Sequence, residues 1–247
     1  MLRFILMVQD QKTPELQRYI TVTEDIYQEV ERGERDRCVG LCKALLSAYD
    51  KIEGEEMAYW RTLNAHKFYI DLASKDKAIE EILKDFQLHG EYEPHTTELF
   101  EKIIKPGMTC IDIGASIGYF TLLMARLVGE TGKVYSIEPT GNQFPILKKN
   151  IEKNGYNNRV ETLNYAAWDE SGKEVKIQTN KGDVGIMTGM KVDDIIPAGK
   201  KVDFVKIDTD GSEPHVLKGL IGTIEKNPQL QMVIEFYPKY IEDLGGD

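Results

Sequence analysis

A glycine-rich segment next to an acidic residue is the first candidate for chemistry in this sequence. The segment Asp112–Gly118 (DIGASIG) follows a short apolar run. Gly114 permits a tight turn, Ala115 and Ser116 are small enough to let the backbone approach a ligand, and Gly118 lets the next helix pack closely. Such a turn binds ligands at the N-terminus of the following helix. By itself, this pattern is also typical of dinucleotide-binding folds and of turns without a ligand.

Two acidic residues make the prediction more specific. Asp112 lies on the strand before the turn, where a carboxylate is costly to bury unless it meets a cation. Glu138 and Pro139 end the next apolar run, about 20 residues after Gly118, where an acid can accept hydrogen bonds from ribose hydroxyls. A ligand with a cationic end and a ribose fits both acids, and S-adenosylmethionine has these features. A solvated charge at a strand end is the alternative interpretation of Glu138.

A second polar cluster follows another apolar run and consists of Asp208, Asp210, Glu213 and His215. We expect Asp208 to lie closest to the cofactor and to the molecule that accepts the transferred group. Asp210 or His215 is the candidate general base for a hydroxyl acceptor, with a plain surface position as the alternative for His215. A divalent metal ion held by these carboxylates is a less favoured alternative. Lys206 alternates inward, which predicts a buried salt bridge with one of the acids.

The elements that must position these residues are strands and helices in alternation. Short runs rich in Ile and Val predict strands at Thr109–Ile113, Val134–Ile137, Arg159–Asn164, Phe204–Ile207 and Met232–Phe236. Helical spacing predicts helices at Phe120–Leu127, Gln143–Asn154 and Glu213–Lys226. This alternation predicts an α/β fold: a Rossmann-like, doubly wound, mostly parallel sheet with ligands at the carboxyl ends of its strands.

Two further segments of this domain have open interpretations. The segment Thr179–Lys191 contains three glycines and two methionines (Gly182, Gly185, Gly189, Met187 and Met190). We interpret it as a mobile loop, either a lid over an acceptor pocket or an ordinary surface connection. Few residues follow the fifth predicted strand, so the domain either lacks its last strands or completes the edge of its sheet in another way.

The first 90 residues have the spacing of helices. Thr13-Pro14-Glu15 is a helix-start signal, and apolar residues then recur at helical intervals, including Met57, Trp60, Leu63 and Ile70. We expect a helical N-terminal extension over residues 1–90 and a Rossmann-like domain over residues 91–247. The aromatic residues Tyr59, Trp60, Phe68 and Tyr69 are interpreted as core, with closure of the pocket or a homodimer contact as alternatives. Cys38 and Cys42 are interpreted as small core residues on one helix face.

The composition of the chain limits the kinds of partner and the cellular compartment that we expect for it. The chain has 247 residues and a formal net charge of −10, which argues against a broad surface for nucleic acid or anionic membranes. No apolar run reaches the ~20 residues of a membrane span. The three cysteines fit a reducing compartment. We therefore expect a cytoplasmic protein with no nucleic-acid partner and no membrane span.

Residues 90–240 resemble the FkbM-type methyltransferases, which use S-adenosylmethionine. The resemblance rests on Tyr92–Thr97 (YEPHTT), Lys105–Gly107 (KPG), Asp112–Tyr119 (DIGASIGY), Val192–Ile195 (VDDI) and Val202–Glu213 (VDFVKIDTDGSE). The chain departs from the family pattern at Ser116, where Asn is usual, and at Asp210 and Ser212, where Glu and Ala are common.

The resemblance implies a domain of the class I methyltransferase type, with roles for particular residues. Glu93 and Asp112 would lie near the methionine end of S-adenosylmethionine and Glu138 near its ribose. Tyr165 and Ala166 would border the adenine. The first 90 residues are not covered by this resemblance.

The resemblance also implies O-methylation of a hydroxyl on a small molecule, a sugar or a lipid, and the sequence does not identify which. An NAD(P)-binding oxidoreductase is the first alternative, although the turn lacks a full G-x-G-x-x-G pattern and Asp112 would repel a pyrophosphate. A non-catalytic binding protein with the same fold is the second alternative.

Overall fold

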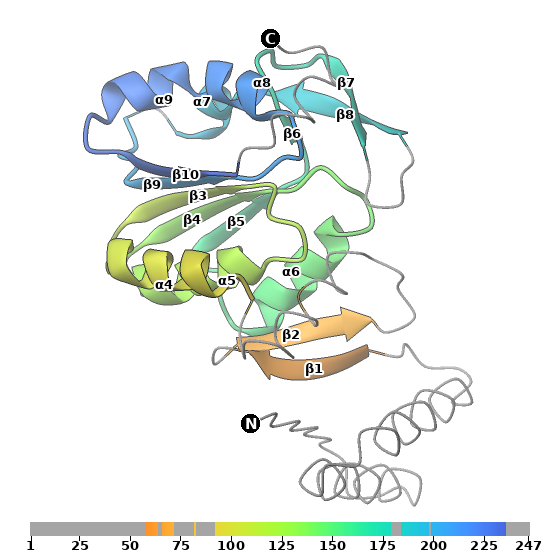
Figure 1. The fold of residues 1–247 in the computed structure, drawn as a ribbon, viewed down its shortest axis with the longest axis vertical. Coiled ribbons are helices and arrows are strands. Elements are labelled where there is room, and N and C mark those ends of the chain that lie inside the picture. The colour runs from red at the N-terminus through yellow and green to blue at the C-terminus, as the bar shows by residue number, and fades with distance from the viewer. Residues whose placement is uncertain are drawn as a thin grey trace, which may run out of the picture. The chain divides into compact units, whose positions relative to one another are not determined.

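The computed structural model describes residues 58–63, 66–71, 82, 92–178, 184–197 and 199–235 (Figure 1). The predicted helix start at Thr13 and the pair Cys38 and Cys42 lie outside these residues. Between residues 71 and 92 of the predicted helical extension, only Ile82 is described, and it is helical and buried. No helix among the described residues is long and apolar enough to cross a membrane.

A five-stranded sheet forms the centre of the main domain. Its strands are β3 (Thr109–Ile113), β4 (Lys133–Ile137), β5 (Val160–Leu163), β9 (Phe204–Ile207) and β10 (Gln231–Ile234). They lie in the order β10-β9-β3-β4-β5, and every neighbouring pair is parallel. All residues of β3 and β9 are buried, as expected for strands covered on both faces. The predicted parallel sheet is confirmed.

Helices cover both faces of this sheet (Figure 1). One face carries α4 (Pro94–Ile103), α5 (Tyr119–Val128) and α6 (Phe144–Lys153), and the other carries α7 (Val192–Ile195), α8 (Glu213–Lys218) and α9 (Ile221–Lys226). The chain runs from the central β3 outward through β4 to β5 and then returns to β9 on the other side of β3. The strand order therefore reverses beside β3, where doubly wound sheets bind ligands.

The helix predicted over Glu213–Lys226 is wrong in one respect, because the structure divides it into α8 and α9. The division falls at Gly219 and Leu220. A Cβ atom at position 219 would lie 2.0 Å from the backbone oxygen of Trp168, so the chain passes close to another segment here. This close approach, which the helical spacing does not reveal, requires a glycine.

The mobile loop predicted over Thr179–Lys191 is also wrong where the structure describes it. Residues Val184–Met190 form strand β8, which pairs antiparallel with β7 (Glu174–Gln178) and parallel with β6 (Ala166–Ala167). Along β8, Ile186 is exposed and Gly189 is buried against the backbone around Trp168, which is the alternation of a strand. The glycines therefore allow close packing of backbones instead of flexibility. Residues 179–183 lie outside the described residues.

The helix predicted around Met57, Trp60, Leu63 and Ile70 is contradicted by two strands. β1 (Ala58–Leu63) and β2 (His66–Asp71) form a two-stranded sheet and carry all four aromatic residues singled out in this region. Aromatic and β-branched residues favour strands, and a short apolar window does not separate the two periodicities.

The chain folds into two compact units, one of Met1–Arg61 with Ile70–Ser74 and the other of Thr62–Tyr69 with Lys75–Asp247. The five-stranded sheet and its helices belong to the second unit. The boundary predicted at residue 90 stays a prediction.

The approach of the β3 turn to the end of β9 gives a first testable prediction. Gly114 has φ +80°, and a Cβ atom there would lie 1.7 Å from the backbone oxygen of Asp208. We expect Gly114→Ala to lower the free energy of unfolding by about 3 kcal/mol or more, since strain and a backbone clash add. Gly172→Ala is the matched control: its φ is +82°, but no atom lies within 4 Å of the added Cβ. This control should cost about 1–2 kcal/mol. If urea unfolding showed equal losses of stability for the two variants, the close approach of Gly114 to the backbone of Asp208 would be contradicted.

Candidate functional site

The turn after β3 forms one wall of the candidate site. Gly114 and Ala115 both donate from their backbone N–H to the carbonyl of Ile137, at 3.0 Å each, which fixes the turn against the end of β4. Ser116 has φ +52° and Gly118 has φ +97° before α5 begins at Tyr119. A left-handed serine is strained, and such strain is often found at ligand sites. The predicted glycine turn is therefore present at the switch point of the sheet.

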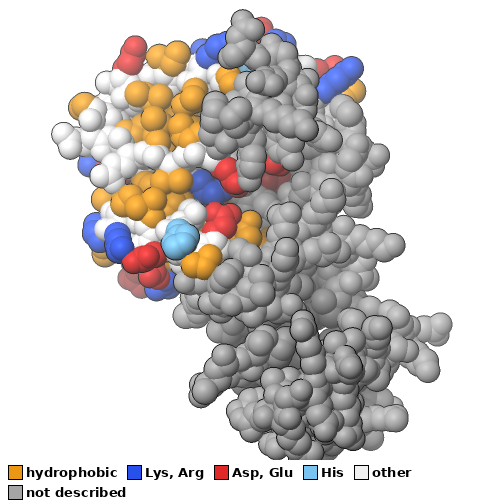
Figure 2. Space-filling model, viewed as in Figure 1, with side chains coloured by type: hydrophobic (Ala, Val, Ile, Leu, Met, Phe, Trp, Pro, Cys, Tyr) orange, Lys and Arg blue, Asp and Glu red, His pale blue; other side chains and the backbone are white. Residues whose placement is uncertain are grey.

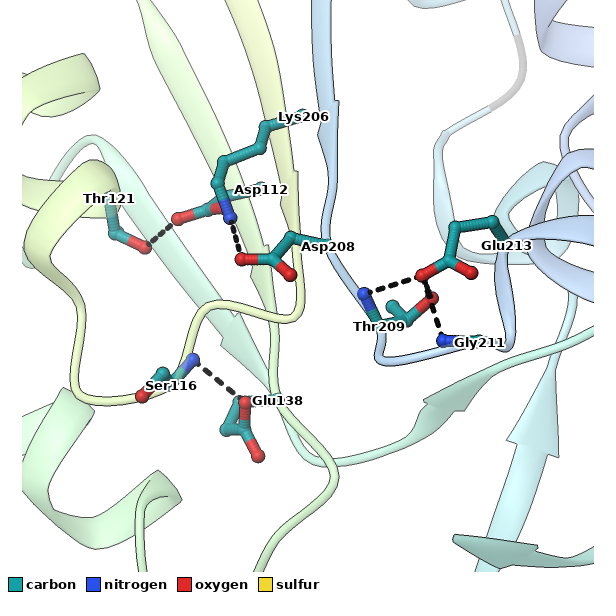
Figure 3. A network of polar contacts seen from close by, with 9 residues as sticks. All are labelled: Asp112, Ser116, Thr121, Glu138, Lys206, Asp208, Thr209, Gly211 and Glu213. Atoms are coloured by element: carbon teal, nitrogen blue, oxygen red, sulfur yellow. Dashed lines mark hydrogen bonds and ion pairs between the residues drawn. The ribbon is translucent and has the colours of Figure 1, made fainter. Parts of the chain in front are cut away.

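Glu138 lies directly beside this turn (Figure 3). It is 3% exposed, and its Oε2 accepts a hydrogen bond from the backbone N–H of Ser116 at 2.7 Å. Its Oε1 accepts from the backbone N–H and the hydroxyl of Thr140 at 2.7 and 2.5 Å. Burial raises the pKa of Glu138, while these hydrogen bonds favour the charged form and oppose the rise. A carboxylate oxygen can accept two hydrogen bonds, so Oε2 can also accept one from a ligand hydroxyl.

Asp112, Lys206 and Asp208 form a charged group at the centre of the sheet (Figure 3). Asp112 on β3 and Lys206 on β9 are register partners on neighbouring parallel strands, so their side chains leave the same face. The Lys206 Nζ lies 2.9 Å from Asp208 Oδ2, which confirms the predicted buried salt bridge. Asp112 is 0% exposed, and its Oδ2 accepts from the hydroxyl of Thr121 at 2.6 Å. Its Oδ1 has no hydrogen-bond partner among the described residues.

Burial and charge act in opposite directions on this group. Burial raises the pKa of Asp112 above its ordinary value, and this effect exceeds the lowering by the Lys206 charge and the Thr121 hydrogen bond. Burial lowers the pKa of Lys206, but the charges of Asp208 and Asp112 outweigh it, so the Lys206 pKa is raised. The lysine therefore stays protonated, and the aspartate oxygen without a partner is electrostatically unsatisfied in the free protein.

A cleft opens over the charged group. Figure 2 shows acidic side chains gathered around a basic one on the face viewed in Figure 1. The residues that line the cleft come from the β3 turn, the start of α5, the end of β9 and two segments before α4: Ile82, Tyr92, Asp112, Gly114, Ala115, Ser116, Ile117, Tyr119, Phe120, Lys206 and Asp208. The structure thus brings together five of the predicted site residues: Asp112, Gly114, Ala115, Ser116 and Asp208.

Aromatic residues of the cleft were missed by the sequence reasoning. Tyr92 and Tyr119 contact each other edge to face at 5.2 Å between ring centroids, and Tyr92 lies 5.9 Å from the ring of Phe120. The Thr97 hydroxyl donates to the carbonyl of Tyr92 and lies 3.3 Å from the hydroxyl of Tyr119. The signal that could have found these aromatics is their position in the sequence, immediately beside Glu93 and Gly118.

The second polar cluster does not converge on one point. Glu213 is 1% exposed, and its Oε1 accepts from the Thr209 N–H and hydroxyl at 3.0 Å each and from the Gly211 N–H at 3.1 Å (Figure 3). It therefore closes the loop in which Asp210 is exposed with φ +50°. Among the described residues, no group of three or more His, Cys, Asp and Glu side chains is placed to hold a metal ion.

His215 lies in another cluster, with Trp168 and Asp169. Its ring stacks on Trp168 at 4.0 Å and 10°, and its Nδ1 lies 2.7 Å from Asp169 Oδ2. Burial raises the pKa of Asp169, but the His215 hydrogen bond and charge outweigh it, so that pKa is lowered. His215 does not line the cleft described above. Asp169 was not found from the sequence, since 46 residues separate the two partners.

The remaining predicted cofactor-binding residues do not line the cleft. Glu93 has φ +42° and precedes α4. The side-chain amide of Asn164 donates to the carbonyls of Glu138 and Pro139 at 2.8 and 3.0 Å, which joins the loops after β5 and β4. Tyr165 and Ala166 follow directly, half-buried and buried. Their contact with an adenine stays a prediction.

Comparison with known proteins identifies a family. The model of the Methyltransferase FkbM domain matches residues 112–244, more than half of the chain. A protein-L-isoaspartate O-methyltransferase from Methanococcoides burtonii is 37% identical over 67 residues, 26% of this chain and 33% of the relative. One from Methanosarcina mazei is 34% identical over 74 residues, 28% of this chain and 30% of the relative. The chain therefore spans a third or less of these curated relatives.

One solved structure that is similar to part of this chain is also described as an FkbM methyltransferase. The methyltransferase FkbM from Methylobacillus flagellatus KT is 19% identical, with a TM-score of 0.41. The alignment covers 64% of this chain and 44% of that one.

The buried Asp112 gives a prediction about stability. Because its pKa is raised on folding, its contribution to stability is fully present below the unfolded pKa of about 3.9 and is lost as the pH rises through the folded pKa. We therefore expect Asp112→Asn to raise the free energy of unfolding by about 0.5–2 kcal/mol at pH 8 and to have little effect near pH 4.

Asp193→Asn is the matched control for this variant. The Asp193 carboxylate is satisfied by the N–H groups of Gly222 and Thr223 and by the Thr223 hydroxyl, so this change should lower stability by about 1 kcal/mol. Urea unfolding at both pH values measures the two effects. A loss of stability in both variants at pH 8 would show that the Asp112 carboxylate is well accommodated.

Proposed function

This chain belongs to the FkbM methyltransferase family, and we propose that it transfers the methyl group of S-adenosylmethionine to a hydroxyl oxygen of a small molecule, sugar or lipid. The observation that carries the proposal is the buried Asp112 carboxylate, which lines the cleft with one oxygen unpaired among the described residues. A cationic ligand would satisfy that oxygen.

The residues of the cleft fit S-adenosylmethionine in charge and polarity. Asp112 would face its positively charged end, and Glu138, with remaining acceptor capacity on Oε2, would hold its ribose hydroxyls. The buried hydroxyl of Ser116 also has no partner among the described residues and lines the same wall. Glu93, Gly118, Pro139, Tyr165 and Ala166 complete the proposed binding residues.

Transfer requires positioning more than activation. When bound, S-adenosylmethionine supplies a methyl group on a cationic sulfur, which is already activated for in-line displacement. The chain's own residues then have to hold the acceptor oxygen in line and exclude water. Asp208 is the charged group of the second polar cluster that lines the cleft, so we assign it to the acceptor side. The apolar rings of Tyr119 and Phe120 help to exclude water.

The acceptor is proposed on two grounds. The curated relatives that match part of this chain are named O-methyltransferases, which supports oxygen as the methylated atom. The net charge of −10 supports a small molecule, sugar or lipid over a nucleic acid. A homodimer contact through the N-terminal aromatics stays an alternative interpretation of those residues.

A binding test separates this proposal from an oxidoreductase. S-adenosylhomocysteine at 100 times its Kd should stabilise the protein by about 2.7 kcal/mol in a thermal-shift experiment, whereas NAD should have no effect. Incubation with S-adenosylmethionine and a panel of hydroxyl-bearing sugars, lipids and phenols should release S-adenosylhomocysteine, and mass spectrometry should find the added methyl on oxygen. Stabilisation by NAD alone would contradict the proposal. Binding without turnover on any acceptor would favour a non-catalytic protein.

Of the two candidate general bases we propose His215, which requires the bound acceptor to extend beyond the lining of the cleft to the cluster of His215, Trp168 and Asp169. Asp169 fixes its Nδ1, and its Nε2 has no hydrogen-bond partner among the described residues, which is the arrangement of a base oriented by a carboxylate. We expect His215→Asn to lower kcat by about 10²–10⁴-fold with little change in S-adenosylhomocysteine affinity.

Asp169→Asn should reduce kcat by disturbing the orientation of the His215 ring, while the neighbouring Glu170→Gln serves as the control. Glu170 is exposed and pairs with Lys173. If Asp210→Asn abolished turnover and His215→Asn did not, the base would be Asp210 instead.

A further inference from the structure

Lys206 carries the positive charge of the cleft. Among the described residues that line the cleft, it is the only basic one, and two of the others, Asp112 and Asp208, are acidic. Its side chain is 6% exposed, which is unusual for a lysine because burial disfavours the charged form. Such a position needs compensation from nearby charges.

The geometry supplies that compensation from several elements. β9 lies next to β3 in the sheet and brings Lys206 beside Asp112 in register. The Lys206 Nζ donates to Asp208 Oδ2 at 2.9 Å and lies 5.1 Å from the ring centroid of Phe120 on α5. Figure 3 shows the Lys206 ammonium between the carboxylates of Asp112 and Asp208. Glu93, before α4, adds a further negative charge that raises the Lys206 pKa.

The charge of Lys206 in turn lowers the pKa of Asp112. Asp112 is fully buried, and burial raises its pKa, whereas the Lys206 charge is the largest influence that lowers it. Two other carboxylates, Asp208 next to Lys206 and Glu138 beyond the turn, interact unfavourably with Asp112. Without the ammonium group, a proton on Asp112 would relieve both the burial and this repulsion. A protonated Asp112 would attract a cation far less.

We propose that Lys206, placed beside Asp112 in register and paired with Asp208, is a positioning residue that holds the negative charge of Asp112 in the free cleft, where the sulfonium of S-adenosylmethionine is to bind. The inference rests on the proposed function, because it concerns the same cofactor. Lys206 acts through the two carboxylates. Its charge makes the affinity for a cationic ligand independent of pH over the neutral range.

The test compares ligands that differ by the charged sulfur. S-adenosylmethionine carries the sulfonium and S-adenosylhomocysteine does not, so the ratio of their Kd values reports the local charge. In the wild type, we expect this ratio to be constant between pH 6 and 9. In Lys206→Met, we expect S-adenosylmethionine affinity to fall as the pH is lowered, by up to about tenfold per pH unit below the new carboxyl pKa. S-adenosylhomocysteine should change less.

Two variants serve as controls. Lys206→Arg retains the charge and should keep the constant ratio. Lys201→Met removes a lysine that is paired with Asp203 on the exposed surface and should also leave the ratio unchanged. A merely structural role for Lys206 would alter both ligands equally and would add no pH dependence.

The outcomes are distinguishable. A Lys206→Met protein that binds both ligands with the wild-type ratio at every pH would overturn the inference about Lys206. A wild type that binds neither ligand would overturn the proposed function itself. If Lys206→Met does not fold, the double variant Lys206→Met with Asp208→Asn removes both ends of the ion pair and leaves Asp112 as the titrating group. This double variant should show the same pH-dependent loss, and a constant ratio in it would overturn the inference.

Discussion

The pairing of β3 with β9 places a carboxylate and an ammonium side by side in the middle of the sheet, and the candidate site depends on that pairing. Asp112 and Lys206 are register partners, and both are almost completely buried. Burying charges is costly unless they are paired and hydrogen-bonded. The Thr121 hydroxyl and the Asp208 carboxylate supply part of what is needed, while one oxygen of Asp112 remains unpaired among the described residues. The rest of the domain must offset this cost.

The sheet can do so because its other face carries a buried apolar cluster. Residues that alternate with Asp112 and Lys206 along the same strands, such as Ile111, Ile113, Val205 and Ile207, form a buried cluster with Val216 and its neighbours under α8 and α9. Because side chains alternate along a strand, the face with Ile111 and Val205 packs in the apolar cluster, while the opposite face carries Asp112 and Lys206 beneath α5. The glycine at position 114 then lets the turn lie against the carbonyl of Asp208, where any side chain would keep the walls apart.

The sequence was sufficient for features that depend on local pattern. The five parallel strands, the turn and the Lys206 salt bridge were predicted because continuous apolar runs, glycine spacing and an inward lysine are each visible within a few residues. Features set by distant contacts were not predictable in this way. Glycines in β8 were interpreted as flexibility, but Gly189 is required by the backbone around Trp168. The partners of His215 and Glu213 likewise depend on how separate segments meet, and the aromatic β1 and β2 have a short pattern that suits either periodicity.

Backbone strain points to the same edge of the sheet as the buried charge. Among the described residues, the non-glycine residues with positive φ are Glu93, Ser116 and Asp210. Each lies immediately before a helix or in a loop at the carboxyl end of a strand, and one of them, Ser116, lines the cleft. Such residues cost about 1–3 kcal/mol each and persist only where the surrounding structure fixes them. Strain and an unsatisfied carboxylate in the same place are difficult to explain as requirements of folding, because a simpler sequence would avoid both. They are readily explained if binding of a cationic ligand recovers part of the cost.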